Sequence, residues 1–206
     1  MAYFITFEGG DGAGKSTLIN GVLSEFKKRG IQHVVSREPG GTPVAEEIRE
    51  VIVKPGRKIE PMTELFLFEA ARAEHVANLI KPTLAQGTHV LCDRYTHSSL
   101  AYQGVARGLG FDFVDKLNDA ATDGLKPDAV VWLKIAPEQA AARVESRGNQ
   151  SRLDAESLAF HKKVFEAFSE ISSREAARFI VLDATKSPAE VFNQLVTHPL
   201  WKKLFP

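Results

Sequence analysis

Short apolar runs alternate with longer amphipathic segments along this chain. Five of the runs are rich in β-branched and aromatic residues and end at polar or turn residues, which predicts strands. These strands are expected at residues 3–7, 32–36, 89–92, 129–135 and 179–182. Strands separated in this way by helix-length segments are typical of a parallel sheet with helices on both faces.

Apolar residues at helical spacing predict the segments between the strands. Helices are expected at residues 16–29, 43–53, 62–86, 111–123, 137–147, 155–177 and 188–196. The last helix has a well-marked start, because Ser187 can act as N-cap, Pro188 fits the first helical position and Glu190 completes a capping box. Such a pattern predicts an α/β fold without repeats or linkers.

Chain length and charge narrow the picture. With 206 residues, the chain suits a single domain spanning 1–206, in which roughly seven tenths of the unfolded surface becomes buried. Lys plus Arg and Asp plus Glu both total 26, so no net charge draws the chain to nucleic acid or to an acidic membrane. We therefore expect no nucleic-acid or membrane partner, and any anion site must be local.

Cysteine usage and the N-terminal sequence bear on the compartment. Cys92 is the one cysteine, which excludes an internal disulfide and fits a reducing cytosol. The N-terminal residues lack a basic leader followed by a long apolar stretch, and no apolar run approaches 18 residues. These features predict a soluble, cytoplasmic protein.

Residues 9–16 read GGDGAGKS, which matches the phosphate-loop pattern G-x-x-x-x-G-K-[ST]. The motif follows the first predicted strand and opens the first predicted helix, as a phosphate loop requires. Its backbone N–H groups can point at phosphate oxygens, and the helix start adds its positive dipole end. Lys15 can reach the β- and γ-phosphates while the Ser16 hydroxyl ligates Mg²⁺. The sequence therefore predicts a nucleoside triphosphate site.

Ligands of parallel sheets bind beyond the carboxyl ends of the strands. The segments that follow the other strands are rich in chemistry: REPGGT at 37–42, DRY at 93–95 and DAT at 183–185. Asp93 and Arg94 place a carboxylate and a guanidinium beside the phosphate loop, where they could ligate a metal and an anion.

Taken together, these segments resemble the bacterial type of the thymidylate kinase family, from Tyr3 to about Val196. The resemblance rests on FEGGDGAGKST, REPGGT, LFLFEAAR, LCDRYTHSSLAYQG, ARVESRGNQSRLD and LDAT. It implies a P-loop NTPase fold with a five-stranded parallel sheet flanked by helices, a homodimer, and Mg²⁺ as cofactor. It also implies transfer of the γ-phosphate of ATP to dTMP, giving dTDP and ADP in dTTP synthesis.

The resemblance implies a donor site and a metal site. ATP would contact Gly10, Asp11, Gly12, Ala13, Gly14, Lys15, Ser16, Thr17 and Asp183. Ser16 would ligate Mg²⁺ directly, and Asp93 would hold it through water.

It likewise implies an acceptor site for dTMP. Arg94 would grip the monophosphate, with Glu38 and Arg49 as further partners of the metal and the phosphate. Asp11 would accept a hydrogen bond from the sugar 3′-hydroxyl. The base and sugar would contact Phe68, Arg72, Ser99, Tyr102 and Gln103.

Physical arguments support several of these roles. Phe68 and Arg72 share one helix face, where a ring can stack on the base and a guanidinium can donate to its carbonyl. On spacing alone, core packing is the favoured explanation of Phe68, and the flanking match LFEAAR reverses that preference. Ser99 and Gln103 carry a hydroxyl and an amide suited to the base, and the Tyr102 ring would exclude a 2′-hydroxyl.

Catalysis would fall to Lys15, Arg94, Arg147 and Arg152, the last two in a lid at about residues 143–154. Family members without an arginine in the phosphate loop, as here, supply it from the lid, and Arg143 is expected to be structural. No strong general base is needed, because a monophosphate with a second pKa of about 6 is already largely dianionic at pH 7.

Two other functions remain as alternatives. A deoxynucleoside kinase would need a carboxylate base, for which Glu8 or Glu38 could serve, and a kinase could act on a monophosphate of another base. A regulatory GTPase is disfavoured, because the third strand ends in DRYT rather than D-x-x-G and the chain contains no Asn-Lys pair.

Overall fold

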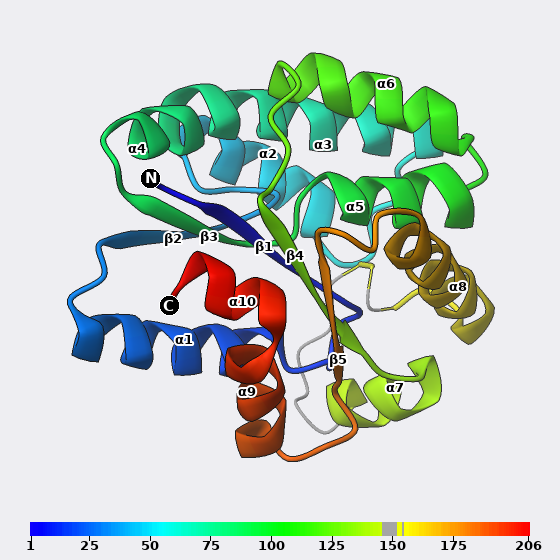
Figure 1. Ribbon diagram of the computed structural model, residues 1–206. Helices are drawn as coiled ribbons and strands as arrows, with labels where there is room; N and C mark the ends of the chain where they lie inside the picture. Colours follow the sequence, from blue (N-terminus) through cyan, green and yellow to red (C-terminus); the bar gives the residue numbers. More distant parts are fainter. Residues whose placement is uncertain (146–151, 154) are drawn as a thin grey trace.

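Five parallel strands form one sheet in the order β2-β3-β1-β4-β5 (Figure 1). The structure is a computed structural model that describes residues 1–145, 152–153 and 155–206. The strands are β1 (Phe4–Glu8), β2 (His33–Arg37), β3 (His89–Asp93), β4 (Ala129–Lys134) and β5 (Phe179–Asp183). All five predicted strands are confirmed, with boundaries that differ by at most one residue.

Most predicted helices are also confirmed. The main helices are α1 (Lys15–Arg29), α2 (Pro43–Val53), α3 (Pro61–His75), α6 (Phe111–Thr122), α7 (Pro137–Glu145), α8 (Leu158–Arg174) and α9 (Pro188–Thr197). The Ser187 capping box is present as predicted. Residues 146 and 147 of the predicted helix at 137–147 lie outside the described residues.

The prediction of one continuous α-helix at 62–86 was wrong. Helix α3 passes into a π-helical turn, η1 (Val76–Ile80), and then into α4 (Lys81–Ala85). Pro82 has no N–H to donate to the preceding turn, and the wider turn accommodates it, with the Lys81 N–H bonded to the Val76 carbonyl.

Three short helices were not predicted. They are α5 (Thr96–Ser99), the π-helical η2 (Leu100–Ala106) and α10 (Pro199–Leu204). The apolar residues of η2 and α10 pack into the cores on the two faces of the sheet, which a short window of sequence does not reveal. The SSLAYQG motif lies on α5 and η2, so its side chains have helical spacing.

The helices cover both faces of the sheet (Figure 1). On one face Ile5 and Phe7 of β1 pack in a core with residues of α1, α9 and α10. On the other face Phe4 packs with Cys92 and Tyr95, next to a core built by β4, η2 and α8. The alternation along β1 follows from the two-residue period of a strand.

Strand register places the candidate segments at one edge. Phe7 of β1 and Arg37 of β2 both lie opposite Asp93 of β3. Because all strands are parallel, the phosphate loop, the REPGGT turn and the DRY segment leave the sheet side by side.

Candidate active site

The phosphate loop has the backbone of an anion cradle. Gly12 has a φ of 83°, and a Cβ there would lie 2.4 Å from the Ala140 carbonyl oxygen, so no side chain fits. Gly14, at φ 97°, precedes α1 and provides no side-chain cap. The first N–H groups of α1 therefore remain available to a bound phosphate.

Lys15 is buried and points back along the loop. Its Nζ donates to the Gly9 carbonyl over 3.1 Å and lies 3.8 Å from carboxylate oxygens of both Asp11 and Asp93. The ammonium thus lies between the phosphate loop and the end of β3, where the predicted donor and metal sites meet.

Asp93 and Ser16 fit a magnesium ion. Asp93 Oδ1 is buried and has no hydrogen-bond partner within the described part of the chain, so a lone pair is left for a ligand or its water. Ser16 is exposed on the first turn of α1. Among the described residues no group of three His, Cys, Asp or Glu side chains is arranged to hold a metal ion by itself. Mg²⁺ suits this sparse donor set, since it is usually held by one or two carboxylates, waters and substrate phosphates.

Arg94 is held at the mouth of the loop. Its Nη2 donates to Asp11 Oδ1 over 2.9 Å, its Nη1 donates to Ser98 Oγ over 3.2 Å, and its guanidinium lies 5.3 Å from the centre of the Tyr102 ring. Burial alone would lower the pKa of Arg94, but the neighbouring Asp11 carboxylate raises it well above its ordinary value. Arg94 therefore stays charged at every functional pH.

A cavity opens between the phosphate loop, the REPGGT turn, α3 and η2. Lys15 and Asp93 line it on the side of the loop. The nine side chains that the sequence assigned to the acceptor all line this same cavity, namely Asp11, Glu38, Arg49, Phe68, Arg72, Arg94, Ser99, Tyr102 and Gln103. Segments from four parts of the chain thus converge where the resemblance implied.

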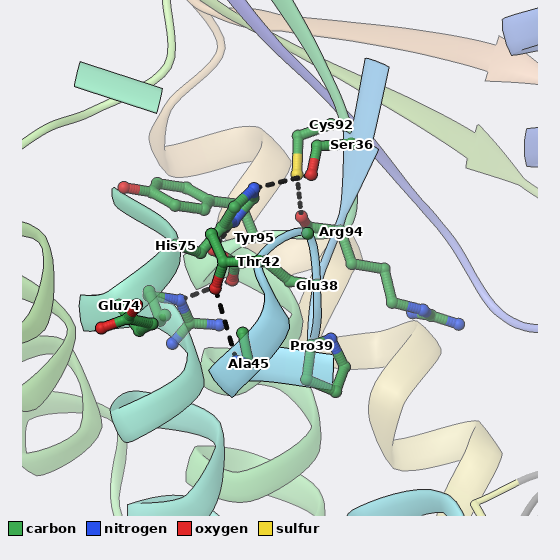
Figure 2. A network of polar contacts seen from close by, with 12 residues as sticks. Ser36, Glu38, Pro39, Thr42, Ala45, Glu74, His75, Cys92, Arg94 and Tyr95 are labelled. Carbon is green, nitrogen blue, oxygen red and sulfur yellow. Dashed lines mark hydrogen bonds and ion pairs between the residues drawn. The ribbon is translucent and has the colours of Figure 1, made fainter. Parts of the chain in front are cut away.

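Glu38 is buried, and both of its carboxylate oxygens accept hydrogen bonds from side chains (Figure 2). Arg72 Nε donates to Oε2 over 2.8 Å and His75 Nδ1 lies 3.0 Å from Oε1, while Ser36 Oγ lies 2.7 Å from His75 Nε2. In this structure Glu38 holds Arg72. Its expected contact with the metal or the acceptor phosphate stays a prediction.

Arg72 is almost wholly buried at the end of the cavity. Its Nη1 donates to Glu69 over 2.6 Å and to Asn118 Oδ1 over 2.7 Å, and its guanidinium lies 5.6 Å from the centre of the Tyr95 ring. Burial would lower the pKa of Arg72, yet the carboxylates of Glu69 and Glu38 raise it. Rigid anchoring of this kind suits a guanidinium that recognises a base.

The other acceptor residues differ in burial and in the hydrogen bonds that hold their side chains. Tyr102 is buried, its hydroxyl makes no hydrogen bond to any described residue, and burial raises its pKa to about 12. The Gln103 amide donates to Glu64 over 2.9 Å, which fixes its orientation. Arg49 donates to the Pro39 carbonyl over 2.7 Å, and Phe68 is half-buried against the cavity.

Of the two predicted lid arginines the structure describes Arg152, and it pairs away from the phosphate loop. Arg152 Nε donates to the Ile52 carbonyl over 2.9 Å, and its guanidinium pairs with Glu64 over 2.6 Å. Arg147 lies outside the described residues. Arg143 donates to the carbonyls of Gly12, over 3.4 Å, and Ala184, over 3.1 Å, in keeping with its expected structural role.

Two further predicted ATP contacts, Thr17 and Asp183, lie at the surface. Thr17 is exposed on the first turn of α1. Asp183 Oδ1 accepts from the Thr185 N–H over 3.0 Å and from the Thr185 hydroxyl over 2.6 Å, so this side chain closes its own turn. An ATP contact in this loop would therefore fall to the backbone.

Several residues that shape the site were missed at the level of sequence. Ser98 binds Arg94, and His75 and Asn118 belong to the network around Arg72. Glu8, for which the sequence suggests only the role of a possible base, accepts from the Tyr95 N–H of the DRY segment. His75 could have been found, because it lies three residues after Arg72 on the same helix face.

A phosphate loop at the first strand, together with an arginine-lined cavity that reaches its lysine, is typical of P-loop kinases that act on small phosphorylated molecules. The family model described as thymidylate kinase matches residues 7–195. The chain therefore belongs to the thymidylate kinase family, and it is an ATP-dependent nucleoside monophosphate kinase with a P-loop NTPase fold.

Relatives match this chain over nearly its full length. A protein named thymidylate kinase from Lactobacillus acidophilus is 45% identical over 199 residues, covering 95% of this chain and 92% of its own. One of the same name from Staphylococcus haemolyticus is 45% identical over 195 residues, covering 94% and 95%. The crystal structure of thymidylate kinase from Ehrlichia chaffeensis is 31% identical, with a TM-score of 0.72, and the match covers 88% of this chain and 92% of that one.

Proposed function

We propose that this enzyme transfers the γ-phosphate of ATP to dTMP, forming dTDP and ADP in dTTP synthesis, with the acceptor in the cavity described above. The observation that supports this most strongly is the convergence of all nine expected acceptor side chains on one cavity that also reaches Lys15. Family membership supports the same reaction.

The donor side uses the phosphate loop. Its backbone N–H groups and Lys15 bind the β- and γ-phosphates. Ser16 and Asp93 would hold Mg²⁺, which would neutralise phosphate charge when bound. The Lys15 ammonium lies near Asp93 at the end of β3. In that position it would face the γ-phosphate and stabilise negative charge during the transfer.

The acceptor side aligns the nucleophile. Arg94 binds the dTMP phosphate as a planar donor, and Asp11 accepts from the 3′-hydroxyl. Phe68 stacks on thymine, Arg72 donates to its carbonyl, and Tyr102 packs against the deoxyribose. Because the acceptor phosphate is largely dianionic at pH 7, alignment and charge neutralisation are sufficient.

The deoxynucleoside kinase alternative relied on Glu8 or Glu38 as base, and both carboxylates are engaged in other contacts. Glu8 is 0% exposed and does not line the cavity, and its two oxygens accept from the Tyr95 N–H and the Ser98 hydroxyl. Glu38 lines the cavity but accepts from Arg72 and His75. Neither carboxylate is placed to take a proton from a sugar hydroxyl.

We propose that Arg147 and Arg152 stabilise the transferred phosphoryl group. For Arg152 this requires an exchange, because its guanidinium is paired with Glu64 in the present arrangement. A phosphoryl group carries more negative charge than the Glu64 carboxylate and therefore competes well for the Arg152 guanidinium.

We also propose a homodimer and a cytoplasmic location. Helices α2, α3 and α6 pack side by side (Figure 1) and expose large apolar side chains at Val51, Met62, Phe66 and Phe113. A second copy covering this face would remove these side chains from water, and sedimentation would report the dimer.

The cellular location is a separate point. The buried free thiol of Cys92 fits a reducing compartment. No helix in the described ranges is long and apolar enough to cross a bilayer.

Incubation of the purified chain with MgATP and a panel of acceptors tests the proposal. The panel contains dTMP, dUMP, the other deoxynucleoside monophosphates and free thymidine, and ADP release is measured. We expect dTMP to be preferred, free thymidine to be inert and chelation of Mg²⁺ to stop turnover. Faster phosphorylation of thymidine or of a purine monophosphate would contradict it.

A further inference from the structure

Arg94 has a backbone conformation that arginine rarely adopts. Its φ is 71°, in the left-handed region that favours glycine, so the surrounding structure must hold it there. The Arg94 N–H donates to the Phe7 carbonyl over 2.9 Å, and the Cys92 thiol donates to the Arg94 carbonyl over 3.2 Å. Figure 2 shows the second of these contacts, with the Arg94 side chain extending away from the His75 ring.

Glu8 provides a further contact to this backbone. It is the last residue of β1, is 0% exposed, and its Oε1 accepts from the Tyr95 N–H over 2.9 Å. That N–H belongs to the peptide unit directly after Arg94, the residue with the positive φ. Glu8 therefore holds the backbone that follows Arg94, and this backbone sets the direction of the Arg94 side chain.

The other oxygen of Glu8 reaches the Arg94 side chain through one intermediate. Ser98 Oγ donates to Glu8 Oε2 over 2.6 Å and accepts from Arg94 Nη1 over 3.2 Å. Because the Ser98 hydroxyl hydrogen is used by Glu8, its lone pairs face the guanidinium. The Glu8 carboxylate thus determines that Ser98 donates to Glu8 and accepts from Arg94. We call this chain of two hydrogen bonds, from Arg94 through Ser98 to Glu8, the relay.

We infer that Glu8 is a positioning residue for the acceptor phosphate, acting on Arg94 through the Tyr95 N–H and through Ser98. This inference rests on the proposed role of Arg94 in binding dTMP. A buried carboxylate is costly unless donors satisfy it, and both oxygens of Glu8 accept from donors that bear on Arg94. Glu8 does not touch substrate itself, because it does not line the cavity.

The substitution Glu8→Gln tests the polarity of the relay. The Gln amide oxygen can still accept from the Tyr95 N–H, but its NH₂ group then faces Ser98 Oγ, which turns the hydroxyl hydrogen toward Arg94. We expect the KM for dTMP to rise about tenfold, as for a weakened hydrogen bond to a charged group. The KM for ATP should be unchanged, and kcat should fall by less than about threefold.

A double-mutant cycle separates positioning from general stability. Ser98→Ala removes the relay and should also raise the KM for dTMP about tenfold. In the Ser98→Ala background, Glu8→Gln should add less than about twofold. If Glu8 had a merely structural role, the increases in KM caused by Glu8→Gln and Ser98→Ala would multiply in the double variant. Should Glu8→Gln fail to fold, Ser98→Ala alone decides the side-chain path, and an unchanged KM for dTMP overturns the inference.

Asp128→Asn is the matched control. Asp128 accepts from the Phe4 N–H over 2.7 Å at the opposite end of β1, so it tethers the same strand without reaching the cavity. We expect its kinetic constants to equal those of the parent.

Arg94→Ala distinguishes the two proposals. If it raises the KM for dTMP while neither Glu8→Gln nor Ser98→Ala does, the positioning role is overturned and the proposed function stands. If Arg94→Ala leaves that KM unchanged, the phosphate-binding role of Arg94 fails first, and the positioning role fails with it.

Discussion

Arg72 Nε donates a 2.8 Å hydrogen bond to Glu38 Oε2, with both side chains almost fully buried. The pair joins two segments that lie 34 residues apart in the chain, the REPGGT turn and α3. It fixes the guanidinium at the end of the cavity, and His75 orients the carboxylate from its other side.

Glu38→Gln should impair acceptor binding as well as stability. The variant replaces one buried acceptor by an amide donor, which we expect to cost about 1–3 kcal/mol of unfolding free energy. Loss of Arg72 alignment should raise the KM for dTMP about tenfold and leave the KM for ATP unchanged. Urea unfolding and steady-state kinetics check both effects. Exposed Glu50 on α2 provides the control, Glu50→Gln, and equal kinetics in the two variants would contradict the assignment.

Lys15→Met should abolish most phosphoryl transfer while dTMP binding persists. The ammonium lies 3.8 Å from carboxylate oxygens of both Asp11 and Asp93, beside the phosphate loop, and its loss removes a positive charge that opposes the charge of the transferred phosphoryl group. We expect kcat to fall at least about a hundredfold. Calorimetry with dTMP checks the acceptor site, and Lys28→Met, at an exposed position of α1, is the control. Near-normal turnover in Lys15→Met would refute the role.

Arg152→Ala and Arg147→Ala should lower turnover more than acceptor affinity. A charge-stabilising arginine can contribute about 10³-fold or more to related phosphoryl transfers. Single-turnover kinetics separate this effect from binding. If both variants kept full turnover, the catalytic arginine would have to come from elsewhere, and the pairing of Arg152 with Glu64 would be its whole role.

Tyr102 should favour deoxyribose over ribose. A buried ring against the sugar leaves a 2′-hydroxyl without a partner, at a cost of about 1–3 kcal/mol, or roughly five- to 150-fold. The ratio of kcat/KM for dTMP and ribothymidine monophosphate is compared in the parent and in Tyr102→Ala. An unchanged preference in a well-folded variant would exclude the steric role and leave the kinase assignment intact.

Glu64 should make stability depend on pH. Burial alone would raise its pKa, but hydrogen bonds from Arg107 and Gln103, with Arg152 nearby, lower it below the ordinary 4.5. A lowered carboxyl pKa stabilises the fold above about pH 4.5, and this contribution is lost as the pH falls through the lowered value. Urea unfolding of the parent and Glu64→Gln should therefore differ more at pH 7 than at pH 3. A constant difference would contradict the ion-pair assignment.

Local sequence determined the elements and the chemistry of single segments. The phosphate loop follows from its glycines and Lys15, and the strand boundaries follow from apolar runs that end at polar residues. Resemblance to a family then assigned Phe68, Arg72 and Tyr102 to one acceptor site, although spacing alone favoured a core position for Phe68.

Only the tertiary structure decided which polar groups meet. Glu8 and Ser98 are 90 residues apart, yet they form one relay to Arg94. Arg152 fitted a catalytic cation by sequence, but the described chain pairs it with Glu64. Buried polar groups must find partners because water cannot reach them, and those partners come from whichever strands and helices pack together. Periodicity within one segment holds no information about that pairing.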